Sequence, residues 1–585
     1  MTKYNGIDID YTRDSNLSEF GLTLLKEKYL KENETSPQEA FARAAVAYCG
    51  GDLALAQRIY NYASNQWVGF ASPVLSNATY PDEPVKNLPI SCYLSYVTDS
   101  VRGLLDHVVE IANLTVLGGG TGGHWVEVRS SSNKSPGSIP FIKSMDTIID
   151  TYQQGQTRRG AYAAYKPISD PDIQEFLKIR IPTGDSSRKC HSVGFHNAVI
   201  ITDEFMGAVH KDLDFSLIDP HSKEVKEIVK ARVLWEELLT TRVRTGEPYI
   251  LFIDTVNRYF PEAQKKQGLK CYASNLCIEI VLATNNERTA VCCLSSLNVE
   301  KYDEWKDTPI VQDMITFLDN VLQVFIDNAP ETISKAKYSA EMERALGLGV
   351  MGYHAYLKKN NWAFGSDEAY KFNNVVFNLI QDRAIAQSLI LGKEKGESPD
   401  MRGTGRRNSH LLALAPTANN AILVGTSPSI EPDNSNLFVH KTRVGSFLVK
   451  DKYLEIELDK IGLNTNIVWK KISEDKGSIQ NIKEIPDNIK QVFKTAFEID
   501  QIDIIRQAAD RQQYICQSQS LNIFLNAGVT KAYVNKVHLL AHELGVKSLY
   551  YIRNNTTTIT SISKETDRVS ILPDSNESSC EACEG

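Results

Sequence analysis

The 585-residue sequence predicts an α/β fold in which a helical N-terminal region precedes a body with a largely parallel sheet or barrel. Between residues 17 and 64, apolar residues recur at spacings of three and four, as on one face of a helix. Further along, short β-rich runs alternate with amphipathic helical stretches. From residue 556 onward the sequence is polar and poor in aromatic residues. We therefore expect a helical region over 1–70, an α/β domain over 71–555 and a flexible tail over 556–585.

Individual elements follow from local patterns. The expected N-terminal helices cover 17–30, 37–48 and 53–63. Two short apolar runs, 249–253 and 198–201, fit buried strands, and the last strand-like run is 548–552. Two longer amphipathic stretches, 313–329 and 373–391, fit helices.

Composition excludes several classes of protein. The net charge of −8 does not favour a nucleic-acid groove. No apolar run reaches the length of a membrane span, and the polar N-terminus does not resemble a signal peptide. The ten cysteines are scattered rather than arranged as a secreted disulfide framework. We expect a cytoplasmic protein whose thiols are buried, metal-bound or redox-active.

Asn275, Cys277 and Glu279 form an unusual set at alternate positions. In an extended segment these side chains share one face, so an amide, a thiol and a carboxylate point into one space. A polar exposed face with an incidental cysteine is one interpretation, and it is slightly favoured by the segment alone. The other is a functional site, in which the carboxylate acts as a general base toward a substrate hydroxyl.

Cys92 and Cys292 are the second candidate feature. Two thiols that meet can deliver two electrons by closing to a disulfide. Buried inert cysteines are the more common alternative. The sequence spacing does not show whether these two meet.

These segments belong to a set of motifs that resembles the large, catalytic subunits of class I ribonucleotide reductases. In chain order the motifs are YNGIDIDYTRD, FASPVL, SCYLSY, NLCIEI, AVCCLSSLN, RALGLGVMGYHAYL, LLALAPTANNA, SLYYIRNNTT and a final CEAC. The resemblance runs from about residue 6 to the C-terminus. It implies a ten-stranded α/β barrel with a central finger loop that carries Cys277.

The resemblance implies reduction of ribonucleotides to 2′-deoxyribonucleotides for DNA synthesis by a thiyl-radical mechanism. The sequence does not distinguish diphosphate from triphosphate substrates, and the resemblance to class I favours ribonucleoside diphosphates. Cys277 would carry the radical and take the hydrogen from the ribose 3′ carbon. Glu279 would accept the proton of the 3′ hydroxyl, and Asn275 would hold a ribose hydroxyl.

By the same resemblance, Cys92 and Cys292 supply the reducing equivalents and end as a disulfide. Cys292 rather than Cys293 fits the A-x-C-x-L-S register of the family. Cys580 and Cys583 in the tail would then pass electrons from thioredoxin or glutaredoxin to that disulfide. A CxxC can also be half of a zinc site, but no second matching pair supports one here.

Tyr550 and Tyr551 are adjacent in a strand-like run, where neighbouring side chains normally diverge to opposite faces. Packing within a strand is the alternative explanation. The resemblance implies that the pair passes a radical from a small (beta) subunit to Cys277, with Tyr550 the nearer member. That subunit would hold a diiron-type metal centre, and this chain would bind no metal or cofactor of its own.

A phosphate site is expected where small and amide residues begin a helix, because backbone N–H groups there face an anion. An ordinary helix start is the alternative. The residues concerned are Pro416, Thr417, Ala418, Asn419 and Asn420. Ser72 and Ser91 resemble family residues that contact the substrate.

Regulation is expected at a specificity site that binds a dNTP or ATP effector at the interface of a homodimer. Asp99 and Arg129 lie at the matching positions, and the loop 153–161 resembles the link to the substrate, with Arg158 as its sensor. An ordinary basic turn is the alternative for this loop. Many large subunits begin with an ATP-binding cone, and the resemblance starts near its end, so we expect no cone-based on/off control by dATP. Such a form suits a virus or a bacterium, and a viral protein would act in the host cytoplasm.

Three other patterns are interpreted as structural. The glycines of 118–123 match GxGxxG but follow a helical stretch, so a turn that allows tight packing is expected instead of a dinucleotide site. The segment 443–447 resembles a glycyl-radical motif but lies far from the C-terminus, so a turn is expected there too. His538 and His542 lie four apart without the glutamate of a zinc protease.

Three rival functions remain. An adenosylcobalamin-dependent (class II) ribonucleotide reductase would share the thiyl chemistry, but the paired tyrosines argue against it. A thiol-disulfide oxidoreductase that uses only the CEAC motif would leave most of the chain unexplained. A non-catalytic nucleotide-binding paralogue would not need the cysteines, Glu279 and both tyrosines together.

Overall fold

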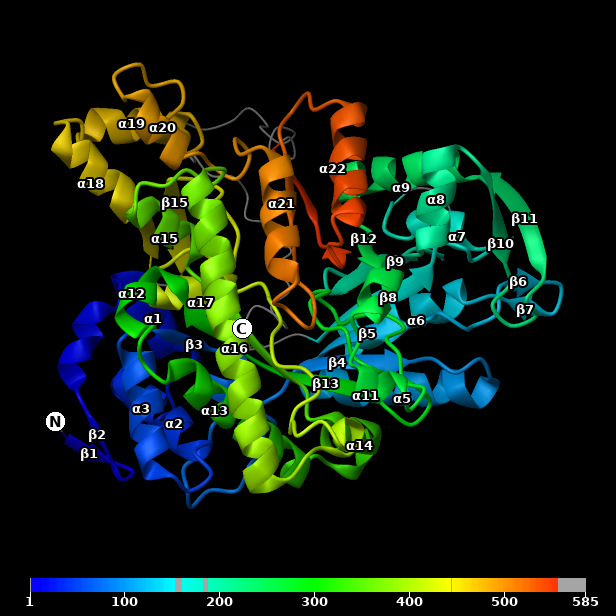
Figure 1. The fold of residues 1–585 in the computed structure, drawn as a ribbon, viewed down its shortest axis with the longest axis horizontal. Coiled ribbons are helices and arrows are strands. Elements are labelled where there is room, and N and C mark those ends of the chain that lie inside the picture. The colour runs from blue at the N-terminus through cyan, green and yellow to red at the C-terminus, as the bar shows by residue number, and fades with distance from the viewer. Residues whose placement is uncertain (1, 153–159, 183–187, 443–444, 556–585) are drawn as a thin grey trace.

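The computed structural model describes residues 2–152, 160–182, 188–442 and 445–555 (Figure 1). The N-terminal helices are α1 (Glu19–Lys28), α2 (Pro37–Ala47) and α3 (Leu53–Ser64), which confirms the helical N-terminal region. A capping box starts α2: Ser36 accepts a hydrogen bond from the Gln38 amide, and Glu39 accepts one from the Ser36 amide.

One sheet of nine strands forms the body of the protein. The predicted strands at 198–201 and 249–253 are confirmed as parts of β9 and β12. In spatial order the main path is β14 (Leu346–Met351), β13 (Ala290–Asn298), β4 (Cys92–Tyr96), β5 (Gly120–His124), β8 (Ala161–Pro167), β9 (Phe195–Ile201), β12 (Tyr249–Phe252) and β18 (Ser548–Leu549), with β3 (Val68–Phe70) beside β13.

Seven of the nine strands form two parallel groups of opposite direction, while β3 and β18 pair antiparallel with β13 and β12. Strands β4, β5, β8, β9 and β12 are parallel to one another, and β13 is parallel to β14. The groups meet in antiparallel pairing at β4 and β13. Parallel bridges from Leu348 to Leu412 and from Leu414 to Gln519 continue the second group. The resemblance implies ten strands; the described part of the curled sheet has nine, and these bridges extend it.

The curled sheet surrounds the loop 271–283. On one side, Tyr165 of β8 donates a hydrogen bond to the Asn275 carbonyl at 2.5 Å. On the other side, the amide of Ser518 donates to the Glu279 carbonyl at 2.9 Å. Because both halves of the sheet hold the loop, the loop occupies the centre of the domain, as the finger loop of the predicted fold does.

Strand β5 corrects one prediction. The glycine run 118–123 is not only a turn, because Gly120–His124 forms a buried strand after helix α5 (Val101–Val116). A Cβ atom on Gly122 would lie 1.9 Å from the Ser274 carbonyl oxygen. The absence of a side chain at Gly122 therefore lets the central loop pack directly on the sheet.

The run 548–552 also differs from prediction. It is not one strand, because Tyr550 and Tyr551 lie between β18 and the separate strand β19 (Ile552–Asn554). Their amides bond outside the nine-stranded sheet, to the Leu521 carbonyl and to the side chain of Asn522. The chain therefore leaves the sheet at the two tyrosines.

Helices cover the sheet. Helices α13 (Ile310–Asn328) and α16 (Asp367–Lys395) pack against each other and confirm two predicted helices, while α5 packs against α6 (Ile139–Thr151). An outer region in Figure 1 has its own apolar core. It contains α18 (Lys452–Lys460), α19 (Asn466–Glu474) and α20 (Asp487–Val492). Strands β15 (Leu437–Thr442) and β16 (Gly445–Lys450) pair antiparallel, so residues 445–447 of the segment for which a turn is expected lie in a strand instead, and residues 443–444 lie outside the described residues.

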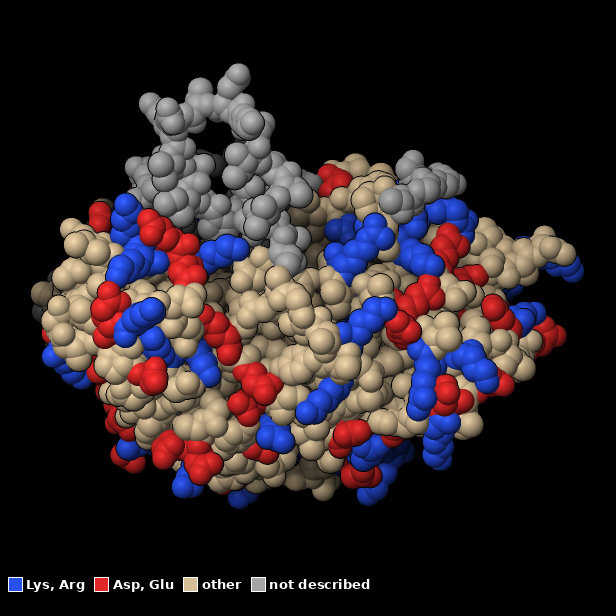
Figure 2. Space-filling view, turned by 90° about the horizontal axis from the view of Figure 1, so that it is seen from above, with Lys and Arg blue, Asp and Glu red and all other residues tan. Residues whose placement is uncertain are grey.

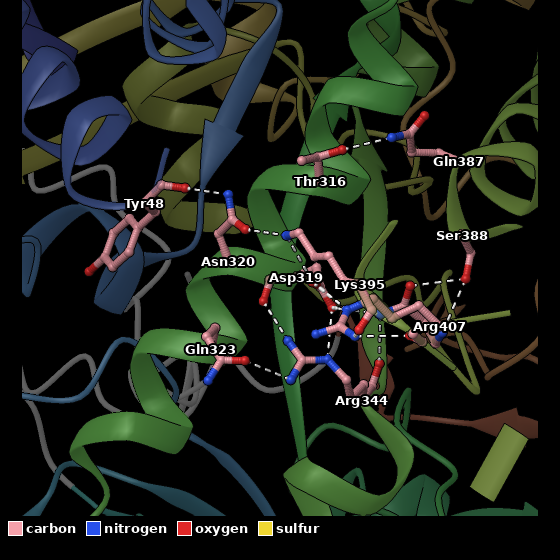
Figure 3. Close-up of polar contacts among 12 residues, drawn as sticks. Tyr48, Thr316, Asp319, Asn320, Gln323, Arg344, Gln387, Ser388, Lys395 and Arg407 are labelled. Atoms are coloured by element: carbon pink, nitrogen blue, oxygen red, sulfur yellow. Dashed lines mark hydrogen bonds and ion pairs between the residues drawn. The ribbon is translucent and has the colours of Figure 1, made fainter. Parts of the chain in front are cut away.

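A buried polar network ties α13 to the rest of the domain (Figure 3). The carboxylate of Asp319 contacts Arg344 at 2.9 Å, Arg407 at 2.8 Å and Lys395 at 3.3 Å. Burial alone would raise the pKa of Asp319, but the two guanidinium groups and Lys395 lower it below its ordinary value. The carboxylate therefore stays charged. It links α13 to Lys395 at the end of α16 and to Arg344 and Arg407.

Candidate active site

The loop 271–283 forms the centre of the candidate site. Cys271 pairs with Ala283 in an antiparallel bridge, and the chain between them turns at Leu276 and Cys277. Ile278 has a φ of +66°, which β-branched residues rarely adopt. The alternation expected of an extended segment is therefore wrong here. The turn, rather than a pleat, sets the directions of the side chains.

Asn275 and Glu279 are nonetheless brought together. The Asn275 amide nitrogen donates a hydrogen bond to the Glu279 carboxylate at 3.0 Å, and its oxygen accepts from the Ile280 amide at 3.1 Å. Both side chains are completely buried, as is Cys277 between them. The thiol, the amide and the carboxylate thus belong to one short loop inside the barrel.

A neighbouring segment holds this loop in place. Ser520 donates hydrogen bonds to the Cys277 carbonyl at 2.6 Å and to the Glu279 carboxylate at 3.1 Å. Gln517 accepts a hydrogen bond from the Val281 amide at 3.2 Å. Sequence reasoning missed both residues, since they lie more than two hundred positions along the chain.

Cys92 and Cys292 lie opposite each other across the β4–β13 pair, as direct partners in register. Both are buried, and no disulfide joins them. Directly opposed residues of an antiparallel pair have Cβ atoms about 4.5–5.5 Å apart, so only small adjustments separate such thiols from a disulfide. Cys293 packs in a different apolar cluster from Cys292, as alternation along β13 requires.

Burial raises the pKa of the Cys292 thiol well above its ordinary value. A hydrogen bond from Gln517 to the sulfur, at 3.5 Å, opposes that effect, whereas neighbouring Cys92 and Cys293 add to it. The Cys292 thiol is therefore protonated at rest and can give up a proton together with an electron.

Tyr550 and Tyr551 do not diverge. Their ring centroids are 4.2 Å apart, because the chain bends between β18 and β19 instead of continuing as a strand. A third ring, Tyr249 at the start of β12, lies 4.7 Å from Tyr550 and 4.9 Å from Tyr551. These three rings share one buried cluster with Cys277 and Cys92. A continuous set of oxidisable side chains therefore reaches the central loop.

Tyr249 could not be singled out from its sequence context, where it is one residue of an apolar strand. Burial raises the pKa of its hydroxyl well above the ordinary value, with smaller contributions from Tyr551 and Glu247. The Nδ1 atom of the neighbouring His196 lies within hydrogen-bond distance of the Tyr551 hydroxyl, at 3.2 Å, and of the Glu247 carboxylate, at 2.6 Å.

The predicted phosphate segment begins helix α17 (Ala418–Val424), as expected. Thr417 accepts a hydrogen bond from the Ser429 amide at 2.7 Å, and Asn420 donates one to the Phe70 carbonyl at 2.8 Å. That bond brings the helix start beside Ser72, the first residue of α4 (Ser72–Ser76). Two of the side chains expected to face a phosphate, those of Thr417 and Asn420, thus bond to other parts of the protein.

Ser91 is buried beside Cys92, and its carbonyl accepts a hydrogen bond from the Gly120 amide at 2.7 Å. The position of Ser91 between β4 and β5 is therefore fixed by the sheet.

The proposed effector residues also meet. The Nε atom of Arg129 lies 3.0 Å from both carboxylate oxygens of Asp99, although thirty positions separate the residues. His221, which sequence reasoning missed, lies 2.8 Å from the same carboxylate. The contact with Asp99 raises the pKa of Arg129. Arg158, Cys580 and Cys583 lie outside the described residues.

The surface charge, the helices and the grouping of possible metal ligands also bear on the expectations from the sequence. On the face shown in Figure 2, the described acidic and basic residues are interspersed rather than gathered into one basic groove. None of the helices in the described ranges is long and apolar enough to cross a membrane. Within those ranges, no three His, Cys, Asp or Glu side chains are grouped so that they could hold a metal ion.

Comparison with known families agrees with this geometry. A sequence model described as "Ribonucleotide reductase, barrel domain" matches residues 90–405 and 400–552. A second model, described as "Ribonucleotide reductase, all-alpha domain", matches residues 15–83. Together they cover the nine-stranded sheet and the N-terminal helices.

Individual relatives extend the match over nearly the whole chain. A protein of Frog virus 3 (isolate Goorha), described as a ribonucleoside-diphosphate reductase large subunit, is 48% identical over 88% of this chain and 90% of its own. The ribonucleoside-diphosphate reductase large subunit of Invertebrate iridescent virus 3 is 39% identical over 99% of this chain and 100% of its own. Among solved structures, the Actinobacillus ureae class Id ribonucleotide reductase alpha subunit matches with a TM-score of 0.82 at 34% identity, covering 94% of this chain and 98% of that one. The chain therefore belongs to the family of class I ribonucleotide reductase large subunits.

Proposed function

We propose that this chain reduces ribonucleoside diphosphates to 2′-deoxyribonucleoside diphosphates through a thiyl radical on Cys277. The observation that carries the proposal is the single buried site. In it, Asn275 and Glu279 are hydrogen-bonded on the loop of Cys277, and Cys92 opposes Cys292 on the adjoining strands.

Each residue has a separate role in the proposed reaction. The Cys277 radical takes the hydrogen from the 3′ carbon, which activates the neighbouring 2′ position, and returns it to the 3′ carbon after the reduction, so that the radical is regenerated. Glu279 accepts the proton of the 3′ hydroxyl, a task that suits a carboxylate within hydrogen-bond reach. Asn275, which already bonds Glu279, orients a ribose hydroxyl.

The reducing equivalents come from the cysteine pair. Cys92 and Cys292 lose two protons and two electrons and form one S–S bond. The substrate takes up both, so its 2′ C–O bond breaks, a C–H bond forms and the hydroxyl leaves as water. In the proposal, Cys580 and Cys583 restore the dithiol by thiol–disulfide exchange and are themselves reduced by thioredoxin or glutaredoxin.

Membership of class I implies a separate small subunit as the source of the radical. We propose that Tyr551 and then Tyr550 carry it toward Cys277, in keeping with the 4.2 Å separation of their rings. A diiron-type centre in the small subunit is the proposed origin of the radical. Both proteins would act in the cytoplasm, or in the host cytoplasm if the chain is viral.

Substrate binding is proposed at the start of α17. Thr417, Ala418, Asn419 and Asn420 would hold the diphosphate mainly through backbone N–H groups, and Pro416, which has no N–H, would set the direction of the chain just before them. Ser72 and Ser91 would contact the substrate. The short bond between Asn420 and the Phe70 carbonyl supports this grouping, because it brings the two segments together.

Allosteric control is proposed at Asp99 and Arg129, where a dNTP or ATP effector would bind, with Arg158 as the link to the substrate. Helix α5 starts beside this pair and exposes Val101, Leu105, Val109 and Val116, which are 77%, 59%, 60% and 47% accessible. Large apolar side chains on one helix face favour a partner surface. We propose that a second copy of the chain covers it, which gives a homodimer.

The test is reduction of CDP by this chain with dithiothreitol and an effector nucleotide. Separate arms contain the cognate small subunit, adenosylcobalamin or neither. Turnover only with the small subunit, abolished by Cys277→Ser and by Tyr550→Phe, is the expected result. Turnover with adenosylcobalamin alone would contradict the radical route. Silence in every arm with an active small subunit would contradict the proposed function.

A further inference from the structure

The side chain of Gln517 connects the loop of Cys277 to the reducing cysteine pair. Its oxygen accepts a hydrogen bond from the Val281 amide at 3.2 Å. Its nitrogen donates to the Leu346 carbonyl at 2.9 Å and to the Cys292 sulfur at 3.5 Å. Gln517 is completely buried, so water does not compete for these bonds.

The orientation of the amide is fixed by its neighbours. The backbone of Val281 faces Gln517 with its N–H, which can only donate, and the backbone of Leu346 faces it with its carbonyl oxygen, which can only accept. A flipped amide would place nitrogen against the donor and oxygen against the acceptor, which loses both bonds. The N–H edge of Gln517 must therefore face Cys292.

We propose that Gln517 is a further catalytic residue, which stabilises negative charge on the Cys292 sulfur while the Cys92–Cys292 pair opens. The inference rests on the proposed function, in which this pair exchanges two electrons and two protons with the substrate. When a thiolate later cleaves this disulfide by thiol–disulfide exchange, one of the two sulfurs leaves as a thiolate. Hydrogen bonds to charged groups are stronger than those to neutral groups, so an N–H donor favours the thiolate.

The surroundings of Cys292 make this donor important. Burial raises the pKa of Cys292, and the bond from Gln517 is the largest influence that lowers it. The nearby Cys92, Cys293 and Glu279 all act in the direction that raises the pKa of Cys292, so none of them compensates a thiolate there.

Gln517→Met tests the proposal, because methionine fills a similar volume without an N–H donor. The first measurement is the pH dependence of iodoacetamide alkylation at Cys292 in the full-length reduced chain, read peptide by peptide by mass spectrometry. We expect the alkylation midpoint to rise by about one pH unit, which is a tenfold weaker acid. The second is the rate at which dithiothreitol reduces the Cys92–Cys292 disulfide, expected to fall by about tenfold.

Gln519→Met is the matched control. Gln519 is equally buried and lies two residues further, but it bonds Arg511, the Ala508 carbonyl and Gln512 rather than the cysteine pair. The Gln519→Met variant shows how far the loss of any buried side-chain amide in this segment changes the alkylation midpoint and the reduction rate. Gln517→Glu is a second variant if the methionine variant does not fold. It keeps an acceptor for Val281, and at alkaline pH its carboxylate should slow the reduction at least as much.

A rise of the midpoint and a slower reduction in the Gln517 variants, with both unchanged in Gln519→Met, is the expected result. Equal behaviour of the Gln517 and Gln519 variants overturns the role of Gln517, while the reductase function stands. If the wild-type chain with its small subunit leaves no Cys92–Cys292 disulfide after turnover, the proposed function fails, and the inference fails with it.

Discussion

At the scale of single residues, Tyr249 has the clearest unassigned position. Its ring contacts both Tyr550 and Tyr551, and it shares their buried cluster with Cys277. Its buried hydroxyl lies close to Tyr551, which adds to the rise that burial causes in the pKa of that hydroxyl, but the two groups are not aligned as a hydrogen bond. The ring rather than the hydroxyl is therefore expected to matter, because the ring keeps the two tyrosines in contact.

Replacement of Tyr249 separates the two contributions. We expect Tyr249→Phe to keep CDP reduction within about threefold of wild type, since packing between the rings is retained. Tyr249→Leu should lose at least about tenfold, because a gap opens beside Tyr550 and Tyr551. The measurement is steady-state turnover with the small subunit, and thermal unfolding shows whether the leucine variant is folded. A large loss in Tyr249→Phe would instead show that its hydroxyl takes part in the reaction.

Glu343 makes stability depend on pH. It ends helix α14 (Ser334–Glu343), where Ser339 and Gln264 donate hydrogen bonds to it. Burial and the nearby Asp400 raise its pKa from 4.5 to about 8, against the influence of Arg288. Between these values the folded protein holds a proton that the unfolded chain has released. This group therefore lowers the free energy of unfolding as pH rises through that window.

Glu343→Gln should remove this contribution. The slope for one proton is at most ~1.4 kcal/mol per pH unit, so the variant should gain stability relative to wild type as pH rises from about 5 to 8. Urea unfolding across that range measures the difference. Glu341→Gln, an exposed change on the same helix, is the control for loss of a charge. A constant difference between Glu343→Gln and wild type would contradict the prediction.

Single residues also show what the sequence could and could not predict. Asn275, Cys277 and Glu279 were identifiable because their chemistry is unusual inside an apolar segment. Their geometry was not, since the turn at Ile278 depends on contacts from Ser520 and Gln517 far along the chain. Local sequence carries no signal for such contacts.

At the scale of elements, helices α13 and α16 were predictable because apolar periodicity persists over their whole length. Strand β5 was not predictable, because Thr121 is the single β-branched residue among its glycines and apolar alternation is absent. Its strand conformation comes from pairing with β4 and β8 on either side. The bend at Tyr550 was missed for a related reason: its amide partner is a distant carbonyl.

The contact between β5 and the central loop leads to a further prediction. A Cβ atom on Gly122 would overlap the Ser274 carbonyl, which is backbone and has little room to move. Gly122→Ala should therefore displace the loop, reduce CDP turnover to below about a tenth of wild type and lower the unfolding temperature.

Gly207→Ala is the matched control for this change. Gly207 lies in helix α8 (Asp203–Lys211) with no atoms within 4 Å of the added methyl group. The same substitution should stabilise the protein there by up to about 1 kcal/mol and leave turnover unchanged. Full activity in Gly122→Ala would show that the loop is not pressed against β5.

At the scale of the whole molecule, the proposed effector pair lies at the start of a helix whose outer face is apolar. Arg129 bonds Asp99, which directly precedes the cap of α5 at Ser100. An effector at this pair and a second subunit on α5 would therefore contact adjoining surfaces. This arrangement would couple nucleotide binding to dimer formation. An effector that binds the dimer more tightly than the monomer shifts the equilibrium toward the dimer.

Charges on α5 test this coupling. The double variant Leu105→Glu/Val109→Glu places two carboxylates on the exposed face, where they would be buried without partners in a dimer. We expect wild type to dimerise more strongly with a dNTP effector and the variant to remain monomeric, as measured by sedimentation velocity. Ile467→Glu, at a 71% exposed site on α19, should dimerise like wild type. A variant that still dimerises would place the interface elsewhere. A wild-type chain that stays monomeric with effector would contradict the homodimer itself, because the apolar face of α5 would then have no second copy to cover it.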